Sequence, residues 1–341
     1  MVNTASKKAI TLAHGSGGRA TRQLLDQTVL RHFGSPDEQG LQDLAFLKVA
    51  ASASVAFTTD SYVVNPLFFP GGDIGKLAVN GTVNDLAVGG AKPLLLSCSL
   101  IMEEGLEIEV LDRVMASMAQ AAETAGVRIV TGDTKVVEHG AADQLFVNTS
   151  GLGLVREGVQ IRSYRAAPGD QLLLSRFIGD HGAAIVDARG ELALYVPVES
   201  GCQPLNGLVE AMLDASAEIH CLRDATRGGV ATVLNEFAQD SGVCLRLQET
   251  LIPVRETVRG VCELLGLDPL YLANEGVLVA VVPKAAAEAV LKAMRSHPSG
   301  VNACCVGEVT ERPQRTVVLE TVFGGERVVD VLFGDQLPRI C

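Results

Sequence analysis

The first half of the chain carries two hydrophobic patterns that predict helices. Between residues 106 and 125, apolar side chains recur at three- and four-residue steps, and Gly126 stands where such a helix would stop. Residues 75–89, GKLAVNGTVNDLAVG, are predicted to form another helix. Short β-branched segments bounded by glycine or charged turns predict strands at 55–64, 127–132 and 144–155.

The segment 156–170 separates this half from the next one. It contains a Pro-Gly-Asp turn before a new apolar run, which indicates a domain boundary. Beyond it, helices are predicted near 205–219, 228–239, 255–265 and 284–296, strands at 172–175, 276–282, 303–309 and 316–321, and a hairpin at 322–332. The mixture predicts an α+β fold with domains at 1–155 and 166–333 and a mobile tail at 334–341.

Composition supports two globular domains and excludes several classes of protein. The 341 residues are 48% hydrophobic, which is enough for a sizeable core in each domain. A net charge of −12, spread along the chain, argues against a nucleic-acid partner. No uncharged apolar run approaches the roughly 18 to 20 residues of a membrane span, and the first residues show no leader pattern. We therefore expect a cytoplasmic protein whose eight cysteines are reduced, at spacings that do not suggest structural zinc.

The segment HGSGGR, from His14 to Arg19, is the first candidate binding site. Its glycines are Gly15, Gly17 and Gly18. Glycines let backbone N–H groups approach an anion closely, and Arg19 could add a charged contact to phosphate. The segment is neither a Walker A motif nor GxGxxG. A plain flexible turn is the alternative interpretation.

Five isolated aspartates stand at predicted strand or helix ends among small or apolar neighbours. They are Asp60, Asp85, Asp133, Asp180 and Asp224. A single such residue is usually a helix cap or a turn former. Several of them together suit Mg²⁺, which takes a few carboxylates alongside phosphate oxygens. Asp85 is the hardest to explain as a cap, because a carboxylate within an otherwise apolar helix needs a partner or a metal to offset its desolvation.

Three further motifs place charged groups or anion sites beside these aspartates. In GDTK, Lys135 follows Asp133 by two residues, so a strand would put both side chains on one face, either in one site or as a simple salt bridge. In LANEG, Glu275 precedes a strand, where a carboxylate can act as a general base or stay solvated. In DATRGG, residues 224–229, glycines at a helix start favour anion binding. His181, in GDHG, could lie near the same site.

The chain ends in PRIC, with Cys341 beyond the last segment that looks able to pack. A frayed end that happens to finish on cysteine is one interpretation. The other is a chemical arm, because the residues from Gly334 to Cys341 could reach on the order of 26 Å and carry a thiol into a pocket. The choice between them depends on finding that pocket.

Taken together, these motifs closely resemble those of the HypE family of hydrogenase maturation factors. The resemblance rests on HGSGGR, TTDSYVVNPLFFPGGDIGKLAVNGTVNDLAVGGAKP, VTGDTKVV, IGDHGAA, RDATRGGVATVLNE, ANEG and PRIC, in the family's order over nearly the whole chain. The family belongs to a superfamily of ATP-using enzymes that includes aminoimidazole ribonucleotide synthetase, selenophosphate synthetase and thiamin-phosphate kinase. The resemblance therefore implies two PurM-like α+β domains per subunit, a homodimer paired through the sheets of its N-terminal domains, and ATP sites near that interface.

The resemblance also implies a reaction. In such carbamoyl dehydratases the carbamoyltransferase HypF places a carbamoyl group on the terminal cysteine, which is Cys341 here. ATP then drives dehydration of the thiocarbamate to a thiocyanate. The cyanide passes through the HypC–HypD complex to the iron of nickel–iron hydrogenase. On this interpretation the tail carries the substrate.

Matching the family's motifs assigns roles to single positions. The residues expected to hold Mg²⁺ are Asp60, Asp85 and Asp224. The residues expected to contact ATP are these three together with His14, Gly15, Gly17, Gly18, Lys76, Asn80, Asp133, Asp180 and Arg227. Cys341 is expected to accept the carbamoyl group, with Lys135 and Glu275 handling protons around it. The segment before Asp60, VAASASVAFTTD, lacks the acidic pair that selenophosphate synthetases carry there, which leaves the set of Mg²⁺ ligands open.

Two rival functions remain open on the sequence alone. One is another ATP-dependent synthetase of the superfamily, which would act on a free small molecule and would not need Cys341. The other is an acidic scaffold whose C-terminal thiol docks to a partner without turnover. ATP hydrolysis that depends on a carbamoylated tail would exclude the scaffold.

Overall fold

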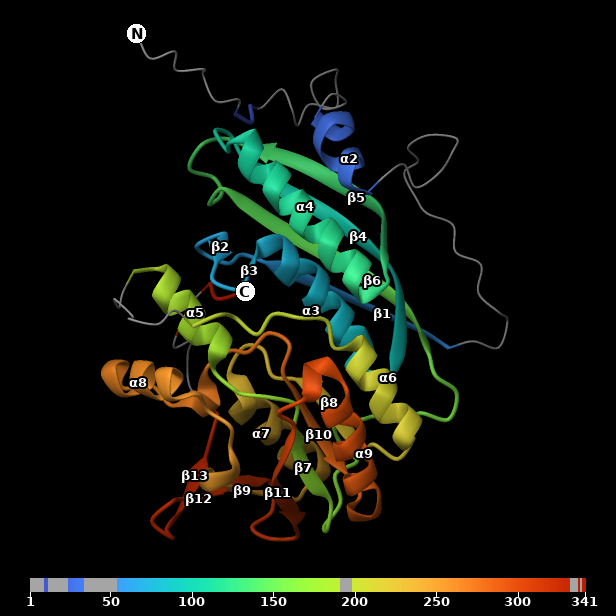
Figure 1. The fold of residues 1–341 in the computed structure, drawn as a ribbon, viewed down its shortest axis with the longest axis vertical. Helices are drawn as coiled ribbons and strands as arrows, with labels where there is room; N and C mark the ends of the chain where they lie inside the picture. The colour runs from blue at the N-terminus through green and yellow to red at the C-terminus, as the bar shows by residue number, and fades with distance from the viewer. Residues whose placement is uncertain (1–8, 12–23, 34–53, 191–197, 332–336, 338) are drawn as a thin grey trace.

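The computed structural model describes residues 9–11, 24–33, 54–190, 198–331, 337 and 339–341. Within these residues the chain forms two lobes, each built around its own sheet (Figure 1). The first lobe contains the main strands between residues 55 and 155, and the second contains the strands between residues 171 and 329. Helices and strands are mixed in both lobes, which confirms the predicted α+β class.

A sheet in the order β1-β6-β4-β5 is the framework of the first lobe. Its strands are β1 (Val55–Tyr62), β4 (Ala91–Glu103), β5 (Arg128–Val137) and β6 (Leu145–Val155). β1 and β4 each pair antiparallel with β6, whereas β4 and β5 run parallel and are joined by helix α4 (Ile108–Ala125). β4 is missing from the predicted strands, because its run PLLLSCSLIM is mostly apolar and alternates only around Ser97 and Ser99.

Helix α3 (Ile74–Val88) lies along this sheet and is almost entirely buried. It follows a short hairpin of β2 (Phe68–Phe69) and β3 (Gly72–Asp73), and the Asp73 side chain caps it by accepting a hydrogen bond from the backbone N–H of Lys76. Gly81 lowers the helix propensity of α3. A Cβ at that position would lie 2.2 Å from the Tyr62 hydroxyl, so glycine is what lets β1 and α3 pack this closely.

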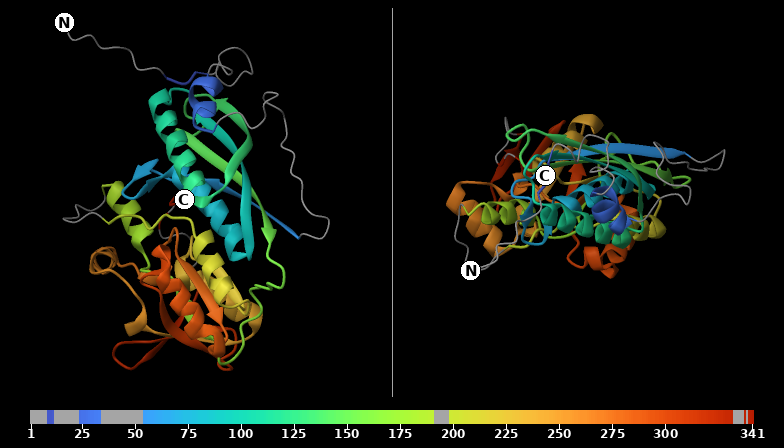
Figure 2. Two further views of the ribbon diagram at one scale, coloured as in Figure 1. Left: turned by 45° about the vertical axis from the view of Figure 1, so that its right-hand side comes forward. Right: turned by 90° about the horizontal axis from the view of Figure 1, so that it is seen from above.

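Helix α4 packs beside α3 on the same face of the sheet (Figures 1 and 2). It ends at Gly126 in the left-handed conformation, as the sequence predicts. The opposite face carries alternate residues of the strands, among them Phe57 of β1, which is 70% exposed, and Ile101 of β4, which is 42% exposed. Within the described residues, this face of the first sheet is therefore covered by no helix.

The sheet of the second lobe has the order β13-β12-β9-β11-β7-β10-β8. Its strands are β7 (Gln171–Leu174), β8 (Cys221–Asp224), β9 (Cys244–Gln248), β10 (Leu278–Val282), β11 (Cys304–Thr310), β12 (Thr316–Glu320) and β13 (Glu326–Val329). Helix α7 (Gly229–Ser241) packs on one face, and α6 (Asn206–Ala215) and α9 (Lys284–Ser296) pack on the other. Because both faces are covered, every residue of β10 is buried.

Several short elements escape the sequence pattern. β8, β9 and helix α5 (Asp180–Ala188) are absent from the predicted elements, although the equally short strands β7 and β12 are among them. The predicted final hairpin is instead formed by β12 and β13 around residues 321–325. Helix α8 (Glu256–Leu265) agrees with its prediction. Of the helices in the described part of the chain, none is long and apolar enough to cross a membrane.

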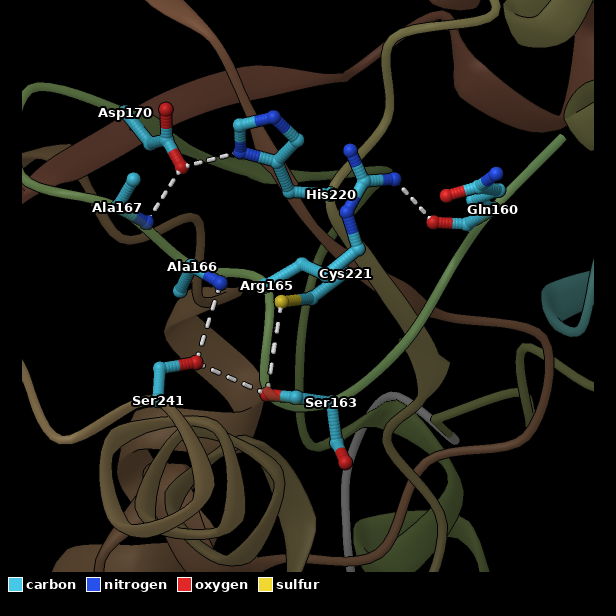
Figure 3. A network of polar contacts seen from close by, with 9 residues as sticks. All are labelled: Gln160, Ser163, Arg165, Ala166, Ala167, Asp170, His220, Cys221 and Ser241. Atoms are coloured by element: carbon cyan, nitrogen blue, oxygen red, sulfur yellow. Dashed lines mark hydrogen bonds and ion pairs between the residues drawn. The ribbon is translucent and has the colours of Figure 1, made fainter.

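Residues 156–170, where the sequence indicates the boundary, are tied to the second lobe by polar contacts (Figure 3). Asp170 Oδ2 lies 2.7 Å from Nδ1 of His220, just before β8. Ser241, the last residue of α7, donates a hydrogen bond to the Ser163 carbonyl at 3.1 Å. These contacts attach the connecting segment to the second lobe.

Candidate active site

Four acidic side chains from both lobes come together where the lobes join. β1 supplies Asp60 and α3 supplies Asp85, whereas the second lobe supplies Asp224 at the end of β8 and Glu275 in the loop before β10. Burial raises the pKa of Glu275, and the charges of the three aspartates raise it further, so all four groups are near enough to interact. We call these four residues the carboxylate cluster. The sequence predicts chemistry at each of them, and the fold brings them together.

Asp85 illustrates the electrostatic strain within the carboxylate cluster. Its Oδ2 accepts a hydrogen bond from the Thr58 hydroxyl at 3.1 Å, and this contact works to lower the pKa of Asp85. Burial has the larger effect and raises that pKa, with the charge of Asp60 adding to the rise. The net rise in pKa means that the surroundings of Asp85 stabilise its ionised form less well than water does.

Asp224 and Glu275 are the most buried members of the cluster, at 6% and 3% exposed. Burial, followed by the charge of Asp85, raises the pKa of Asp224 to about 7. Burial also raises the pKa of Glu275 well above its ordinary value, against the opposing charge of Arg227. Both shifts favour the protonated carboxyl groups, and a bound cation would reverse them.

Asn274 holds the loops of the second lobe around the cluster. Its Oδ1 accepts a hydrogen bond from the backbone N–H of Gly179 at 2.7 Å, and its Nδ2 donates to the carbonyls of Ala225 and Leu272 at 2.9 and 3.0 Å. One buried amide therefore connects the GDHG, DATRGG and LANEG segments and sets the position of the adjacent Glu275. The sequence analysis singled out the LANEG motif for Glu275, but not its neighbour Asn274.

The residues of the cluster suit Mg²⁺ by their chemistry. Among the described residues, no three histidine, cysteine or acidic side chains converge as ligands of a single ion. Mg²⁺ does not need such a cage, because it usually takes one or two carboxylates and completes its octahedron with water and phosphate oxygens. Burial and mutual repulsion raise the pKa of Asp85 and of Asp224, because the negative charge of the ionised carboxylates lacks compensation here. A cation carried with a polyphosphate would supply that compensation.

Lys135 and Asp133 lie on the other face of the first sheet. Their positions in β5 pair with Ile101 and Ser99 of β4, so both side chains point to the uncovered face. Lys135 Nζ lies 2.9 Å from Oδ2 of Asp133, and this hydrogen bond is the main reason that the pKa of Asp133 is lowered. The two do share a face, as predicted, and they form the salt bridge that was one of the two interpretations. The sheet separates Lys135 from the buried Glu275 within one chain.

Three other residues predicted to contact ATP belong to the same region as the cluster. Arg227 is near enough to Glu275 to lower its pKa, and Lys76 is near enough to Cys202 to act on the pKa of that thiol. Asn80 Nδ2 donates a hydrogen bond to Cys202 Sγ at 3.6 Å. In the part of the chain that the structure describes, Asn80 Oδ1 is the only buried side-chain nitrogen or oxygen without a hydrogen-bond partner. An orphaned buried acceptor of this kind is what a ligand contact would satisfy.

Asp180 and the glycine loop are the remaining residues predicted to contact ATP. Asp180 is bound by Arg255, whose Nε lies 3.1 Å from both carboxylate oxygens. Burial raises the pKa of Asp180, and Arg255 opposes that shift, so the pair is a local ion pair at the start of α5. The predicted contacts in HGSGGR, namely His14, Gly15, Gly17 and Gly18, lie outside the described residues.

The end of the tail lies against the segment that follows β1. The backbone N–H of Val63 donates to the Cys341 carbonyl at 3.1 Å, and that of Asn65 donates to the Arg339 carbonyl at 3.2 Å. Ile340 is buried, and Figure 1 shows the C-terminus between the two lobes. The tail therefore rests inward in this conformation, against the segment that follows β1. Its mobility stays a prediction.

Side chains from two other segments hold the tail, and the sequence did not reveal them. Arg189 Nη2 donates to the Arg339 carbonyl at 2.9 Å, and Arg339 forms an ion pair with Asp143. Arg339 also donates to the Val63 carbonyl at 3.1 Å. Asp143 and Arg189 lie in no recognised motif, so only the folded structure brings them to the tail.

Comparison with known proteins identifies the family. Residues 41–155 match the family described as AIR synthase related protein, N-terminal domain, and residues 167–320 match the corresponding C-terminal domain. The chain is 53% identical to the carbamoyl dehydratase HypE of Rhodobacter capsulatus, over 97% of this chain and 98% of that protein. The chain belongs to the HypE family of carbamoyl dehydratases.

Solved HypE structures support the same assignment. A crystal structure of hydrogenase maturation protein HypE in complex with ATP matches with a TM-score of 0.92 and 48% identity, over 97% of this chain and 99% of that one. A HypE chain from a HypE–HypF complex matches with a TM-score of 0.80 and 48% identity, over 83% of this chain and 92% of that one. These matches confirm the predicted HypE-type, PurM-like two-domain fold.

Proposed function

We propose that this chain uses ATP to dehydrate a carbamoyl group carried on its own Cys341, which converts a thiocarbamate to a thiocyanate. The observation that carries the proposal is the inward tail. The backbone carbonyl of Cys341 is bound to Val63, which follows Asp60 of the cluster by three residues. Docking at this position places Cys341 in the region where the two lobes meet, which a synthetase acting on a free metabolite would not require.

The proposed chemistry accounts for the residue types. The carbamoyl oxygen attacks the γ-phosphate of ATP as one N–H proton is lost, and the C–O bond then breaks as the second proton leaves the nitrogen. The products are the thiocyanate, ADP and phosphate. This sequence needs charge stabilisation at the phosphates and a base near the nitrogen. Asp60, Asp85 and Asp224 are the residues that would hold Mg²⁺, which supplies the charge stabilisation, and Glu275 is the buried carboxyl group proposed as the base.

The proposed ATP site lies at the join of the lobes. Its residues are those matched to the family motifs, namely His14, Gly15, Gly17, Gly18, Asp60, Lys76, Asn80, Asp85, Asp133, Asp180, Asp224 and Arg227. The unpartnered Oδ1 of Asn80 supports this placement. Asp180 would act in it only by way of Arg255, which already engages both of its carboxylate oxygens.

The proposed partners follow from the reaction. HypF would supply the carbamoyl group, and a HypE relative is found in complex with HypF. The HypC–HypD complex would accept the cyanide on its way to the hydrogenase iron. A cytosolic location fits the proposed chemistry, because that compartment keeps thiols reduced and the reaction needs Cys341 as a thiol.

We also propose a homodimer through the uncovered face of the first sheet. Phe57 and Ile101 expose apolar surface there, and a second copy would bury it. The same face carries Asp133 and Lys135, which cannot reach Glu275 around their own sheet. Pairing of the sheets would let Lys135 of one copy approach the site of the other, and its proposed role in proton transfer depends on that pairing.

Replacing Phe57 with aspartate should convert the dimer to a monomer. An ionised carboxylate in the centre of an apolar interface is costly to desolvate, so association should weaken by at least about a hundredfold, roughly 2.7 kcal/mol. Sedimentation velocity at several concentrations measures the change. The matched control is Phe323→Asp in the β12–β13 turn, where the side chain is 96% exposed on the second lobe. An unchanged dimer in both Phe57→Asp and Ile101→Asp would rule out this interface.

Turnover of ATP tests the proposed function directly. Wild-type protein carbamoylated by HypF should release ADP and phosphate in a single turnover, whereas unmodified protein should release almost none. ATP consumption that ignores the state of Cys341 and responds to a free metabolite would favour the related synthetase. Carbamoylation without any ATP consumption would favour the scaffold.

A further inference from the structure

His181 is a buried side chain that the proposed chemistry leaves without a role. It is the second residue of α5, is 1% exposed, and packs edge-on against Phe69 with the ring centroids 5.4 Å apart. Nε2 lies 2.8 Å from the Ile340 carbonyl, and Nδ1 lies 2.8 Å from the Ser200 hydroxyl. The ring therefore connects the body of the protein to the residue immediately before Cys341.

The partners of the ring determine which nitrogen carries the proton. A carbonyl oxygen can only accept, so Nε2 carries the hydrogen that is donated to Ile340. In a neutral ring Nδ1 is then an acceptor, and the Ser200 hydroxyl donates to it. The Ser200 oxygen in turn accepts a hydrogen bond from the backbone N–H of Cys202 at 3.2 Å. Every donor in this series of hydrogen bonds has an acceptor, which is the arrangement expected of a fixed, neutral histidine.

The environment keeps the ring neutral. Burial lowers the pKa of His181 to about 4, because the apolar surroundings disfavour the imidazolium, and the Ile340 carbonyl only partly opposes this. A ring with that pKa is almost entirely neutral at neutral pH. His181 is therefore poorly suited to general acid–base catalysis and well suited to holding the tail through one directed hydrogen bond.

Each of the last three backbone carbonyls of the tail accepts a hydrogen bond, and the described donor to the Ile340 carbonyl is His181. Asn65 and Arg189 bind the Arg339 carbonyl, and Val63 binds the Cys341 carbonyl. The hydrogen bond from His181 lies between these two points and is made by a side chain anchored in α5 of the second lobe. The tail is thus held from both lobes at once.

We propose that His181 is a positioning residue for the reaction, which holds the carbamoylated Cys341 at the carboxylate cluster by donating its Nε2–H to the Ile340 carbonyl. This inference rests on the proposed function. HypF must reach Cys341 before dehydration, so loss of the hydrogen bond should slow dehydration but should not slow carbamoyl transfer. Loss of one such bond, worth about 1 kcal/mol net, should lower the equilibrium constant for docking of the tail about five- to tenfold, which raises the small undocked population by the same factor.

Two substitutions separate positioning from packing. In His181→Gln the side-chain amide nitrogen can take the place of Nε2 and donate to Ile340, whereas in His181→Asn the shorter amide can take the place of Nδ1 only. Both variants put a neutral amide into the same buried space, and thermal unfolding of each gives its structural effect. The control is His297→Asn, which changes a half-buried histidine after α9 in the second lobe.

The first readout is the rate at which iodoacetamide alkylates Cys341 in unmodified full-length protein, measured by peptide mass. The proposal predicts alkylation about five- to tenfold faster in His181→Asn, a value near wild type in His181→Gln, and no change in His297→Asn. Equal rates in His181→Asn and wild type would overturn it. This readout needs neither ATP nor HypF, so it tests the hydrogen bond between His181 and the tail even if the proposed function fails.

The second readout is single-turnover loss of water from carbamoylated Cys341 with ATP. Dehydration should slow in His181→Asn, by at most about tenfold, and recover in His181→Gln, while carbamoyl transfer from HypF is slowed in neither variant. Equal losses in both variants, in step with their thermal stabilities, would show that His181 serves packing alone. Slower carbamoyl transfer to the same extent as dehydration would likewise overturn the proposal.

Discussion

Replacing Cys341 with alanine should abolish formation of the thiocyanate while leaving the fold and ATP binding nearly unchanged. The substitution removes the sulfur that would carry the substrate, and no other described thiol has the same position at the end of the tail. The backbone contact between the Cys341 carbonyl and Val63 does not use the side chain and should persist. Because the side chain is only partly buried, the free energy of unfolding should fall by less than about 0.5 kcal/mol.

Intact mass after incubation with HypF, carbamoyl phosphate and ATP measures acceptance, and urea unfolding measures stability. The matched control is Cys304→Ala in β11, which removes another half-buried thiol and should accept the carbamoyl group normally. A carbamoyl adduct on Cys341→Ala at the wild-type rate would place the acceptor elsewhere. A loss of several kcal/mol in stability would mean that the terminal side chain is part of the core.

Replacing Glu275 with glutamine should leave carbamoyl acceptance intact and slow dehydration by about 10²- to 10⁴-fold. That range is the usual contribution of a positioned general base, and glutamine keeps the size of the side chain while removing its basicity. Single-turnover mass spectrometry of carbamoylated protein follows both steps. The control is Glu263→Gln on the exposed side of α8, which should leave both steps unchanged. Normal thiocyanate formation by Glu275→Gln would remove Glu275 from the reaction.

The same substitution should stabilise the protein in the absence of ATP and Mg²⁺. Burial, together with the charges of Asp224, Asp60 and Asp85, raises the pKa of Glu275 in the folded state above its value in the unfolded chain. The native state therefore binds the extra proton, and the stability that Glu275 contributes is lost as pH rises through its folded pKa. Glutamine does not titrate, so its advantage in urea unfolding should be larger at pH 8 than at pH 5. A constant difference between the two variants across this range would contradict the assigned electrostatics.

The sequence predicts the larger elements and the chemistry of single positions, but not which positions meet. A long periodic segment such as α4 is recognisable because its buried face repeats over several turns. β4 was missed because a mostly apolar strand at the centre of a sheet resembles any apolar run. The raised pKa of Asp224, caused by burial and by Asp85, depends on the packing of β8 against α3, which no local pattern encodes.

Position on a sheet face shows the same limit. The two-residue spacing of Asp133 and Lys135 predicts that they share a face, and they do. Which face that is depends on the side where α3 and α4 pack, and this is set by the whole lobe. Similarly, PRIC suggests an arm but gives no sign that His181 and Asp143 bind it, because these residues are distant in sequence and come together only on folding.

Intact mass of the purified wild-type protein, after incubation with HypF, carbamoyl phosphate and ATP, is the most direct test of the central claim. We predict that HypF first places a carbamoyl adduct that maps to Cys341, and that the isolated adduct persists without ATP and loses one water when ATP is added. An unmodified Cys341 accompanied by ATP turnover on a free metabolite would contradict it, as would a carbamoyl adduct on Cys341 that persists unchanged in the presence of ATP and Mg²⁺.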